Sequence, residues 1–309
     1  MIGGLDGISY LEGPILAAAL LAMGLGLGVL TGLFGVGGGF LIVPLLNVAF
    51  GMDYTLAKGS CLACIFGTSA SGLMRHLRLG HVAVKTMLII AGGSVAGAML
   101  GGMLNDYLER VVCGGDQLRF ELIMHPTYIA LLIVAGWIVL KGPDEATTHN
   151  APLQRLPIGP KIRIQRTGQE GVSLPGLVYV GVGIGILAGL LGVSGVIMMP
   201  LLLAVVGMNP RQAIGTSLGI VVFASASGTV EYGLDDKVNL MVAMSILIGS
   251  TIGVQFGAWL CAKLHAGSVR GYFVVLVAAV IVMIAVDLAV KIRHYRVRPQ
   301  PPTPAHPTR

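Results

Sequence analysis

The chain has 309 residues, of which 55% are hydrophobic and only 11% are charged, with a formal net charge of +6. Soluble domains carry about 25% charged residues, so this composition excludes an ordinary water-soluble protein and indicates a polytopic membrane protein. Most of the positive charge lies in a connector and at the C-terminal end. It therefore indicates orientation in a membrane and gives no signal for binding of nucleic acid.

Membrane-spanning helices are predicted along most of the chain, because about 20 apolar residues cross a bilayer as a helix. Two further apolar segments, 39–50 and 196–207, are too short to cross comfortably, and each follows a glycine cluster. We therefore expect 14–50 and 175–207 to be units of a helix, a break and a half-helix. The expected full-length helices are 14–35, 54–74, 82–104, 125–141, 175–193, 211–230, 238–262 and 271–291.

These elements divide the chain into four parts. A first transmembrane repeat covers 1–142 and includes a polar loop at 105–124. A proline-containing connector covers 143–174, and a second transmembrane repeat covers 175–291. Residues 292–309 form a basic, proline-rich tail that we expect to be disordered.

The two repeats match in register. Gly32–Gly39 and Pro44 correspond to Gly189–Gly195 and Pro200, and Ser69–Gly72 corresponds to Ser225–Gly228. Their loops carry opposite charge, since 75–85 is basic whereas its counterpart 231–237 is acidic. By the positive-inside rule the two loops face opposite sides, as inverted repeats require. The sequence thus predicts an all-α polytopic membrane protein with two homologous, inverted repeats and glycine-broken helices.

The glycine breaks are the first candidate site. A half-helix that starts after a break presents backbone N–H groups with partial positive charge, and these attract anions. Two such starts could converge on one small anion, although plain helix packing through small residues is the alternative. The predicted binding residues are Gly35, Gly37, Gly38, Gly39, Gly192, Ser194, Gly195 and Val196, and the prolines that mark the helix breaks are Pro44 and Pro200.

The helices that follow the half-helices supply further candidates. Lys58 and Ser60 in the first repeat correspond to Ile214 and Thr216 in the second, and Ser217 follows. The hydroxyl groups of Ser60, Thr216 and Ser217 are predicted to donate to the anion, or alternatively to their own backbone carbonyls. Lys58 is predicted to attract the anion, or alternatively to extend its ammonium to the membrane interface.

Several kinds of chemistry lack a pattern in the sequence. There is no nucleophile–base pair, no clustered metal ligand and no Walker motif, so we predict no enzyme, metal site or cofactor. Asp287 is interpreted as an interfacial residue, and no buried relay of acids and histidines is found. Without a relay, outward anion movement is favoured, since an inside-negative potential contributes about 2.3 kcal/mol per charge and 100 mV.

At these residues the chain resembles the TauE/SafE family of sulfite and organosulfonate exporters. The resemblance rests on Gly32–Gly39 with Pro44, on Gly189–Gly195 with Pro200, and on Ala213–Leu218. It covers about 15–105 and 175–290, and the second copy departs from a full glycine run at Ser194 and Val196. It implies small sulfur-containing anions as substrates.

The resulting prediction is a secondary transporter that exports a small oxyanion, such as sulfite or sulfoacetate, by alternating access. It would lie in the cytoplasmic (inner) membrane, with the lipid bilayer and a small anionic substrate as partners and no nucleic acid. Homo-oligomerisation stays open. The alternatives are a permease for another small solute and a membrane scaffold that transports nothing.

Overall fold

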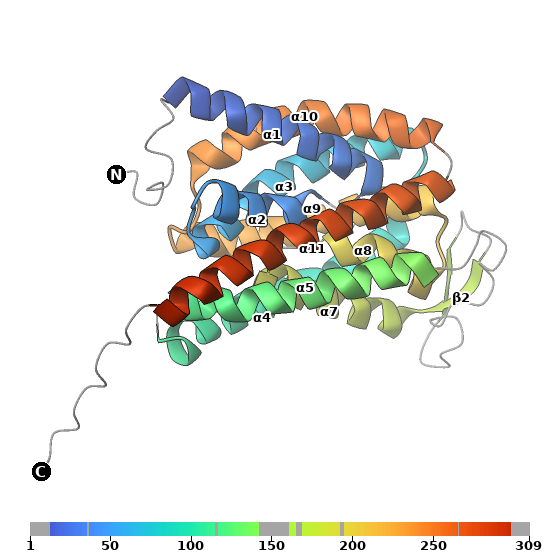
Figure 1. Cartoon of the computed structure of the whole chain (residues 1–309). Coiled ribbons are helices and arrows are strands. Elements are labelled where there is room, and N and C mark those ends of the chain that lie inside the picture. Colours follow the sequence, from blue (N-terminus) through green and yellow to red (C-terminus); the bar gives the residue numbers. More distant parts are fainter. Residues whose placement is uncertain are drawn as a thin grey trace, which may run out of the picture.

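The computed structural model describes residues 13–35, 37–114, 117–141, 161–164, 169–191, 195–264 and 266–297. Within these ranges the chain is helical apart from one ribbon of two antiparallel strands, β1 (Lys161–Ile164) and β2 (Gln169–Ser173). This ribbon lies within the expected connector, next to the start of the second repeat (Figure 1). The protein is therefore an all-α membrane protein with a small surface ribbon.

Eight long helices form the bundle: α1 (Gly13–Phe34), α3 (Tyr54–Arg78), α4 (Val84–Tyr107), α5 (Gln117–Lys141), α7 (Leu174–Leu191), α9 (Pro210–Leu234), α10 (Leu240–Lys263) and α11 (Ala266–Val297). Among the described residues, seven helices are long and apolar enough to cross a membrane. The remaining long helix, α3, buries several polar side chains inside the bundle. The chain therefore crosses the membrane several times.

Two short helices follow breaks at the positions that the sequence predicts. α1 ends at Phe34, and the next helix, α2 (Gly39–Pro44), continues as a π-helical turn, η1 (Leu45–Ala49). In the second half, α8 (Gly195–Leu201) continues as η4 (Leu202–Val206). Because proline has no N–H to donate to the preceding turn, Pro44 and Pro200 explain why each half-helix widens at that point.

Two predicted boundaries differ from the structure. Residues 105–124, predicted as a polar loop, are largely helical, because α4 continues into η2 (Leu108–Val112) and α5 begins at Gln117. The buried side chains of Phe120 and Met124 recur at helical spacing and explain why α5 starts early. The predicted disordered tail also begins too early, since α11 reaches Val297, and 298–309 lie outside the described residues.

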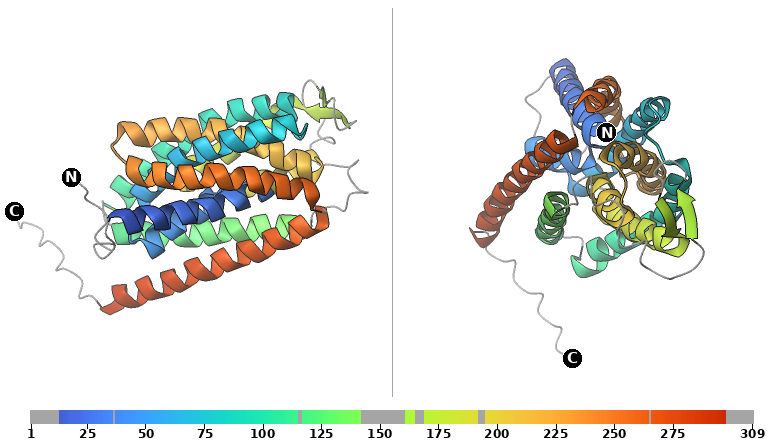
Figure 2. Two further views of the ribbon diagram at one scale, coloured as in Figure 1. Left: turned by 90° about the horizontal axis from the view of Figure 1, so that it is seen from above. Right: turned by 90° about the vertical axis from the view of Figure 1, so that its right-hand side faces the viewer.

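Glycines bring helices of the two halves into direct backbone contact. α1 packs along α10, and α4 packs along α7 (Figures 1 and 2). A Cβ added to Gly28 of α1 would lie 2.2 Å from the carbonyl oxygen of Ser250. A Cβ added to Gly185 of α7 would lie 2.2 Å from the carbonyl oxygen of Ser94. Gly28 corresponds to Gly185, and Ser94 corresponds to Ser250. Each repeat therefore supplies the glycine of one contact and the serine carbonyl of the other.

Helices α3 and α9 cross at the centre of the bundle. Gly72 of α3 faces Leu218 of α9, and Gly228 of α9 faces Leu62 of α3, so the two helices run antiparallel. The half-helices α2 and α8 lie on opposite sides of this centre along the bundle axis, whereas α5 and α11 pack together along one flank (Figure 1). The break regions therefore lie inside the molecule.

Candidate functional site

The first break is enclosed by α3 and α9. Gly35, Gly37 and Gly38 have φ angles of 68°, 71° and 76°, which residues other than glycine rarely adopt. The Ser217 hydroxyl donates to the carbonyl oxygen of Gly35 at 2.7 Å or to that of Ile214 at 2.8 Å. The structure thus uses Ser217, a predicted ligand of the anion, to satisfy the backbone of the break.

The space beside Gly37 is filled by the side chains of Val221, Ile65 and Ser69. A Cβ at Gly37 would lie 3.3 Å from the Oγ of Ser69, and Ser69 is fully buried. Within the described parts of the chain, the Ser69 hydroxyl has no hydrogen-bond partner. A buried hydroxyl without a partner costs about 1–3 kcal/mol, so this group is available for a ligand.

The first half-helix starts near the middle of α3. The Cys61 thiol lies 3.7 Å from the carbonyl oxygen of Gly39, and both residues are buried. α2 also contacts α8, whose first residue, Gly195, is buried. Gly192 and Ser194 lie outside the described residues, and of Val196 only the helical backbone is described. The two half-helices therefore begin close together, near the crossing of α3 and α9.

Side chains from α3 and α9 close the helix ends that precede the breaks. His76 Nε2 lies 3.4 Å from the carbonyl oxygen of Gly32 in α1. The Tyr232 hydroxyl donates to the carbonyl oxygen of Gly189 in α7 at 3.1 Å. His76 and Tyr232 occupy corresponding positions in the two repeats. Each repeat thus supplies the polar cap for its own broken helix.

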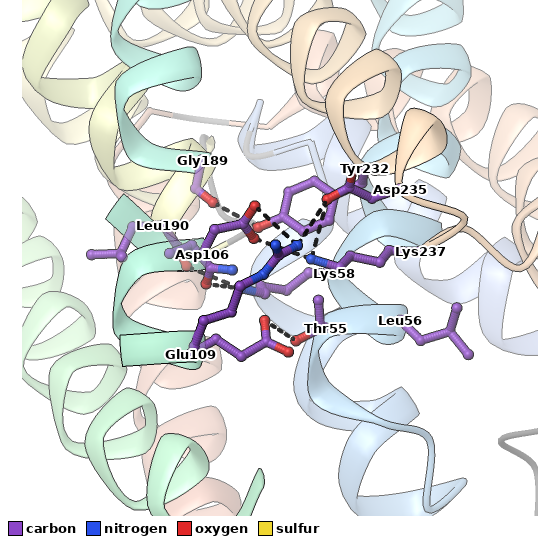
Figure 3. A network of polar contacts seen from close by, with 12 residues as sticks. Thr55, Leu56, Lys58, Asp106, Glu109, Gly189, Leu190, Tyr232, Asp235 and Lys237 are labelled. Atoms are coloured by element: carbon purple, nitrogen blue, oxygen red, sulfur yellow. Dashed lines mark hydrogen bonds and ion pairs between the residues drawn. The ribbon is translucent and has the colours of Figure 1, made fainter. Parts of the chain in front are cut away.

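Lys58 lies at the second break and does not reach the membrane interface. Its side chain is fully buried, and its ammonium donates to the Asn105 side chain and, at 3.3 Å, to the carbonyl oxygen of Leu190 (Figure 3). It also lies 5.2–5.5 Å from the ring centroids of Phe120, Tyr54 and Tyr232. The interfacial alternative for Lys58 is therefore wrong. The Lys58 side-chain nitrogen thus lies within an aromatic enclosure at the end of α7.

An ion-pair network covers Lys58 on one side (Figure 3). The Lys237 ammonium lies 3.1 Å from Asp106 and 3.3 Å from Asp235. Burial alone would lower the pKa of Lys237, but its bonds with these two carboxylates, aided by the charge of Glu109, outweigh burial and raise it. Lys237 is therefore charged at neutral pH and connects α4 with the loop between α9 and α10.

Ser60 and Thr216 bind backbone groups of the opposite repeat. The Ser60 hydroxyl accepts from the N–H of Asn239 at 2.8 Å, and the Thr216 hydroxyl accepts from the N–H of Ala83 at 3.0 Å. Neither hydroxyl bonds its own preceding carbonyl in the way that the sequence alternative proposed. Their role in binding an anion stays a prediction.

A buried group of ionisable side chains lies on the flank formed by α5 and α11. His125 Nε2 lies 3.2 Å from the Asp287 carboxylate, and Glu121 is 8% exposed. The sequence showed no buried relay of acids and histidines, whereas the fold brings Glu121, His125 and Asp287 together here. α5 starts earlier than predicted and therefore includes Glu121. No group of three or more such ligands arranged for a metal ion occurs in the described part of the chain.

The end of α3 opposite Lys58 is basic. Arg75 and Arg78 line an open pocket of about 230 Å³ together with Ser71, Met74 and Gln255. Gln255 Nε2 donates to the Ser71 hydroxyl at 2.7 Å, which joins α10 to α3 there. The sequence had assigned Arg75 and Arg78 to a basic loop, and this end lies away from the acidic residues around Lys237.

Comparisons with known proteins agree with this architecture. The family described as Sulfite exporter TauE/SafE matches residues 20–284. The probable membrane transporter protein YdhB of Bacillus subtilis is 23% identical over 75% of this chain and 85% of its own length. YunE of the same organism, also described as a probable membrane transporter protein, is 25% identical over 87% of this chain and 96% of its own length.

A probable membrane transporter protein of Methanocaldococcus jannaschii is 23% identical over 78% of this chain and 86% of its own length. No solved structure matches the chain. The descriptions of the family and of these relatives are those of transporters rather than enzymes. The chain is thus a multi-pass membrane transporter, and it belongs to the sulfite exporter TauE/SafE family.

Proposed function

We propose that this transporter exports a small oxyanion, such as sulfite or an organosulfonate like sulfoacetate, across the cytoplasmic (inner) membrane. The printed description of the family supports this class of substrate, whereas the relatives are described only as probable membrane transporters. The single observation that carries the proposal is the meeting of the two half-helix starts near the crossing of α3 and α9.

The chemistry of that place suits a small anion. The start of a half-helix presents backbone N–H groups, and a positive partial charge is stabilised there by a negative ligand. Ser69 adds a buried hydroxyl without a partner among the described residues, beside Gly37. Lys58 adds a buried nitrogen donor at the second break. A small oxyanion would offer acceptors for all three kinds of group.

Alternating access follows from an inverted repeat. We propose that the halves are inverted copies, because corresponding residues contact one another with roles exchanged, as Gly28 with Ser250 and Gly185 with Ser94 do. In such transporters one repeat moves against the other around a fixed central site. The glycine-mediated backbone contacts between α1 and α10 and between α4 and α7 would form the rigid arms of this motion.

The outward direction rests on the membrane potential. An inside-negative potential favours export of an anion by about 2.3 kcal/mol per charge and 100 mV, and by about twice that for a dianion. Because His125 and Asp287 form a buried ionisable pair, the lack of a coupling group no longer supports outward movement. Export therefore rests on the potential and on the family's description.

Efflux from proteoliposomes tests the proposal. Purified protein in vesicles loaded with sulfite or sulfoacetate should release the anion, faster with an inside-negative potential. Ser69→Ala should lower efflux at least about tenfold at subsaturating anion, because loss of one bond to a charged ligand costs about 1.5–3 kcal/mol. Ser225→Ala is the matched control, since the Ser225 hydroxyl bonds the Val221 carbonyl of its own helix at 2.6 Å.

Three outcomes would contradict the proposal in different ways. Equal efflux of Ser69→Ala and the control would remove Ser69 from the site. Efflux of another solute, such as a cation or a thiol metabolite, without efflux of sulfur oxyanions would identify a different permease. No flux of any solute, together with loss of function on deleting 298–309, would favour a membrane scaffold.

A further inference from the structure

The flank formed by α5 and α11 holds three ionisable side chains inside membrane-spanning helices. Glu121 and His125 of α5 are 8% and 3% exposed, and the Asp287 side chain of α11 is 12% exposed. Ionisable groups at such depth are costly and are rarely kept without a function. Neither the half-helix site nor the ion pairs around Lys237 include them.

The geometry of His125 leaves its Nε2 atom facing the Asp287 carboxylate. Its Nδ1 lies 2.7 Å from the backbone carbonyl oxygen of Glu121, which can only accept, so Nδ1 carries a hydrogen. A neutral imidazole then has a lone pair on Nε2, and this atom lies 3.2 Å from a carboxylate oxygen of Asp287. Two acceptors at this distance repel each other unless one proton lies between them.

We propose that His125 and Asp287 form a proton-binding site and that its occupancy is coupled to movement of the transported anion. One proton from solution binds at Nε2 of His125 or at the Asp287 carboxylate. The pair changes from a neutral imidazole beside a carboxylate to an imidazolium–carboxylate pair or a neutral acid hydrogen-bonded to imidazole. No other bond forms or breaks, and the proton returns to solution when the site empties.

Asn47 links this pair to the first half-helix. The amide nitrogen of Asn47 donates to the Glu121 carboxylate at 3.0 Å and to the Met52 carbonyl oxygen at 3.0 Å. Asn47 lies in η1, which continues α2, and the backbone carbonyl of the same Glu121 accepts from His125. A change at the His125–Asp287 pair can thus be transmitted through the Asn47 side chain to the first half-helix, which carries the candidate anion site. The second repeat has Leu203 at the position of Asn47.

The groups that face the pair come from four elements. α5 contributes Glu121, and its exposed Arg119 lies two residues earlier. η1 contributes the uncharged Asn47, and α11 contributes Asp287 itself. α3 contributes Tyr54, whose ring centroid lies 5.8 Å from that of His125 and 5.3 Å from the Lys58 ammonium. Tyr54 therefore separates the proposed proton site from the buried Lys58 nitrogen.

The test uses an anion whose own charge does not change with pH. Methanesulfonate is suitable, whereas sulfite takes up a proton near neutral pH and would confuse the result. In proteoliposomes the flux of methanesulfonate should change about fivefold or more between about pH 6 and about pH 8, a size typical of coupled sites. Asp287→Asn should remove this dependence, because its amide donates to Nε2 without a bound proton. His125→Gln should also remove it and replaces Asp287→Asn if that variant fails to fold.

A control and a second readout separate this inference from the proposed function on which its transport step rests. Thr127→Ala changes an exposed hydroxyl of α5 that bonds the Ile123 carbonyl, so it should keep the wild-type pH profile. Without any anion, a folded state that holds the extra proton gains stability as pH falls. The melting temperature of the wild type, relative to Asp287→Asn, should therefore rise between about pH 8 and about pH 6.

The outcomes are distinct. If the protein transports no sulfonate but the melting temperature relative to Asp287→Asn depends on pH as expected, the proton site is supported and the proposed substrate is wrong. If sulfonate moves and the pH profiles of wild type and both variants coincide, the coupling is wrong. If the relative melting temperature is also independent of pH, the pair binds no proton and only joins α5 to α11.

Discussion

The side-chain nitrogen of Lys58 lies 3.3 Å from the carbonyl oxygen of Leu190, so a residue within the aromatic enclosure contacts the end of the helix before the second break. Leu190 is the penultimate residue of α7, where carbonyl groups lose their helical partners. A lysine from one repeat thus takes the place of the missing backbone donors in the other.

Replacing this lysine should destabilise the protein. Lys58→Met keeps most of the volume but leaves the Leu190 carbonyl and the Asn105 side chain without their donor. Each buried polar group left in this way costs about 1–3 kcal/mol, so thermal unfolding in detergent should occur at lower temperature. Lys263→Met is the matched control, because that ammonium lies 3.9 Å from the Trp259 ring at a helix end. It should lose about 1 kcal/mol or less, and a more stable Lys58→Met protein would refute the capping role.

The glycine contacts should be equally intolerant in both halves. Gly28→Ala and Gly185→Ala each place a methyl group 2.2 Å from a backbone oxygen, so the paired helices must separate. Overpacking of this kind costs about 1–3 kcal/mol. We expect a similar loss of thermal stability in the two variants.

The controls lie two residues away on the same helices, on a different face. Nothing lies within 4 Å of a Cβ added to Gly26 or to Gly183. Gly26→Ala and Gly183→Ala should therefore be neutral or more stable by up to about 1 kcal/mol, since alanine is the better helix former. If all four variants behave alike, close backbone packing does not hold the halves together.

The His81 side chain should make stability depend on pH. Burial, followed by the charge of Arg211, lowers the pKa of His81 below its ordinary value of 6.5. The unfolded chain therefore binds this proton more readily than the folded chain, and stability falls as pH drops below about 6.5. The melting temperature should decrease from about pH 7.5 to about pH 5.5, and His81→Gln should reduce the decrease. An unchanged slope in that variant would assign the effect to other groups.

Much of the fold follows from the sequence because helix length and glycine position are local signals. The breaks near Gly35–Gly39 and the half-helix before Pro44 needed only runs of apolar residues and the turn preferences of glycine. The start of α5 was missed because the polar residues Gln117, Arg119 and Glu121 made 117–124 read as part of the polar loop. The recurrence of Phe120, Met124 and Tyr128 every four residues was the available signal for a helix.

Contacts between the halves were not predictable in the same way. The sequence placed hydroxyl groups at Ser60 and Thr216, but only the fold shows that each lies next to a backbone N–H of the other repeat. Likewise, Asp287 is separated from His125 by most of the chain, and no local pattern pairs them. Side-chain partners that depend on the packing of distant helices need coordinates.

Removing the Ser60 and Thr216 hydroxyls should therefore have matching effects. Ser60→Ala leaves the partly buried N–H of Asn239 without its acceptor at 2.8 Å, and Thr216→Val does the same to the buried N–H of Ala83 at 3.0 Å. Each loss should cost about 1–3 kcal/mol. The exposed Ser245 hydroxyl bonds only its own helix, so Ser245→Ala should be neutral. Thermal unfolding measures all three, and hydrogen exchange should quicken at Asn239 or Ala83 respectively. If both variants keep wild-type stability while anion affinity falls, the hydroxyls act on the substrate and not on the backbone.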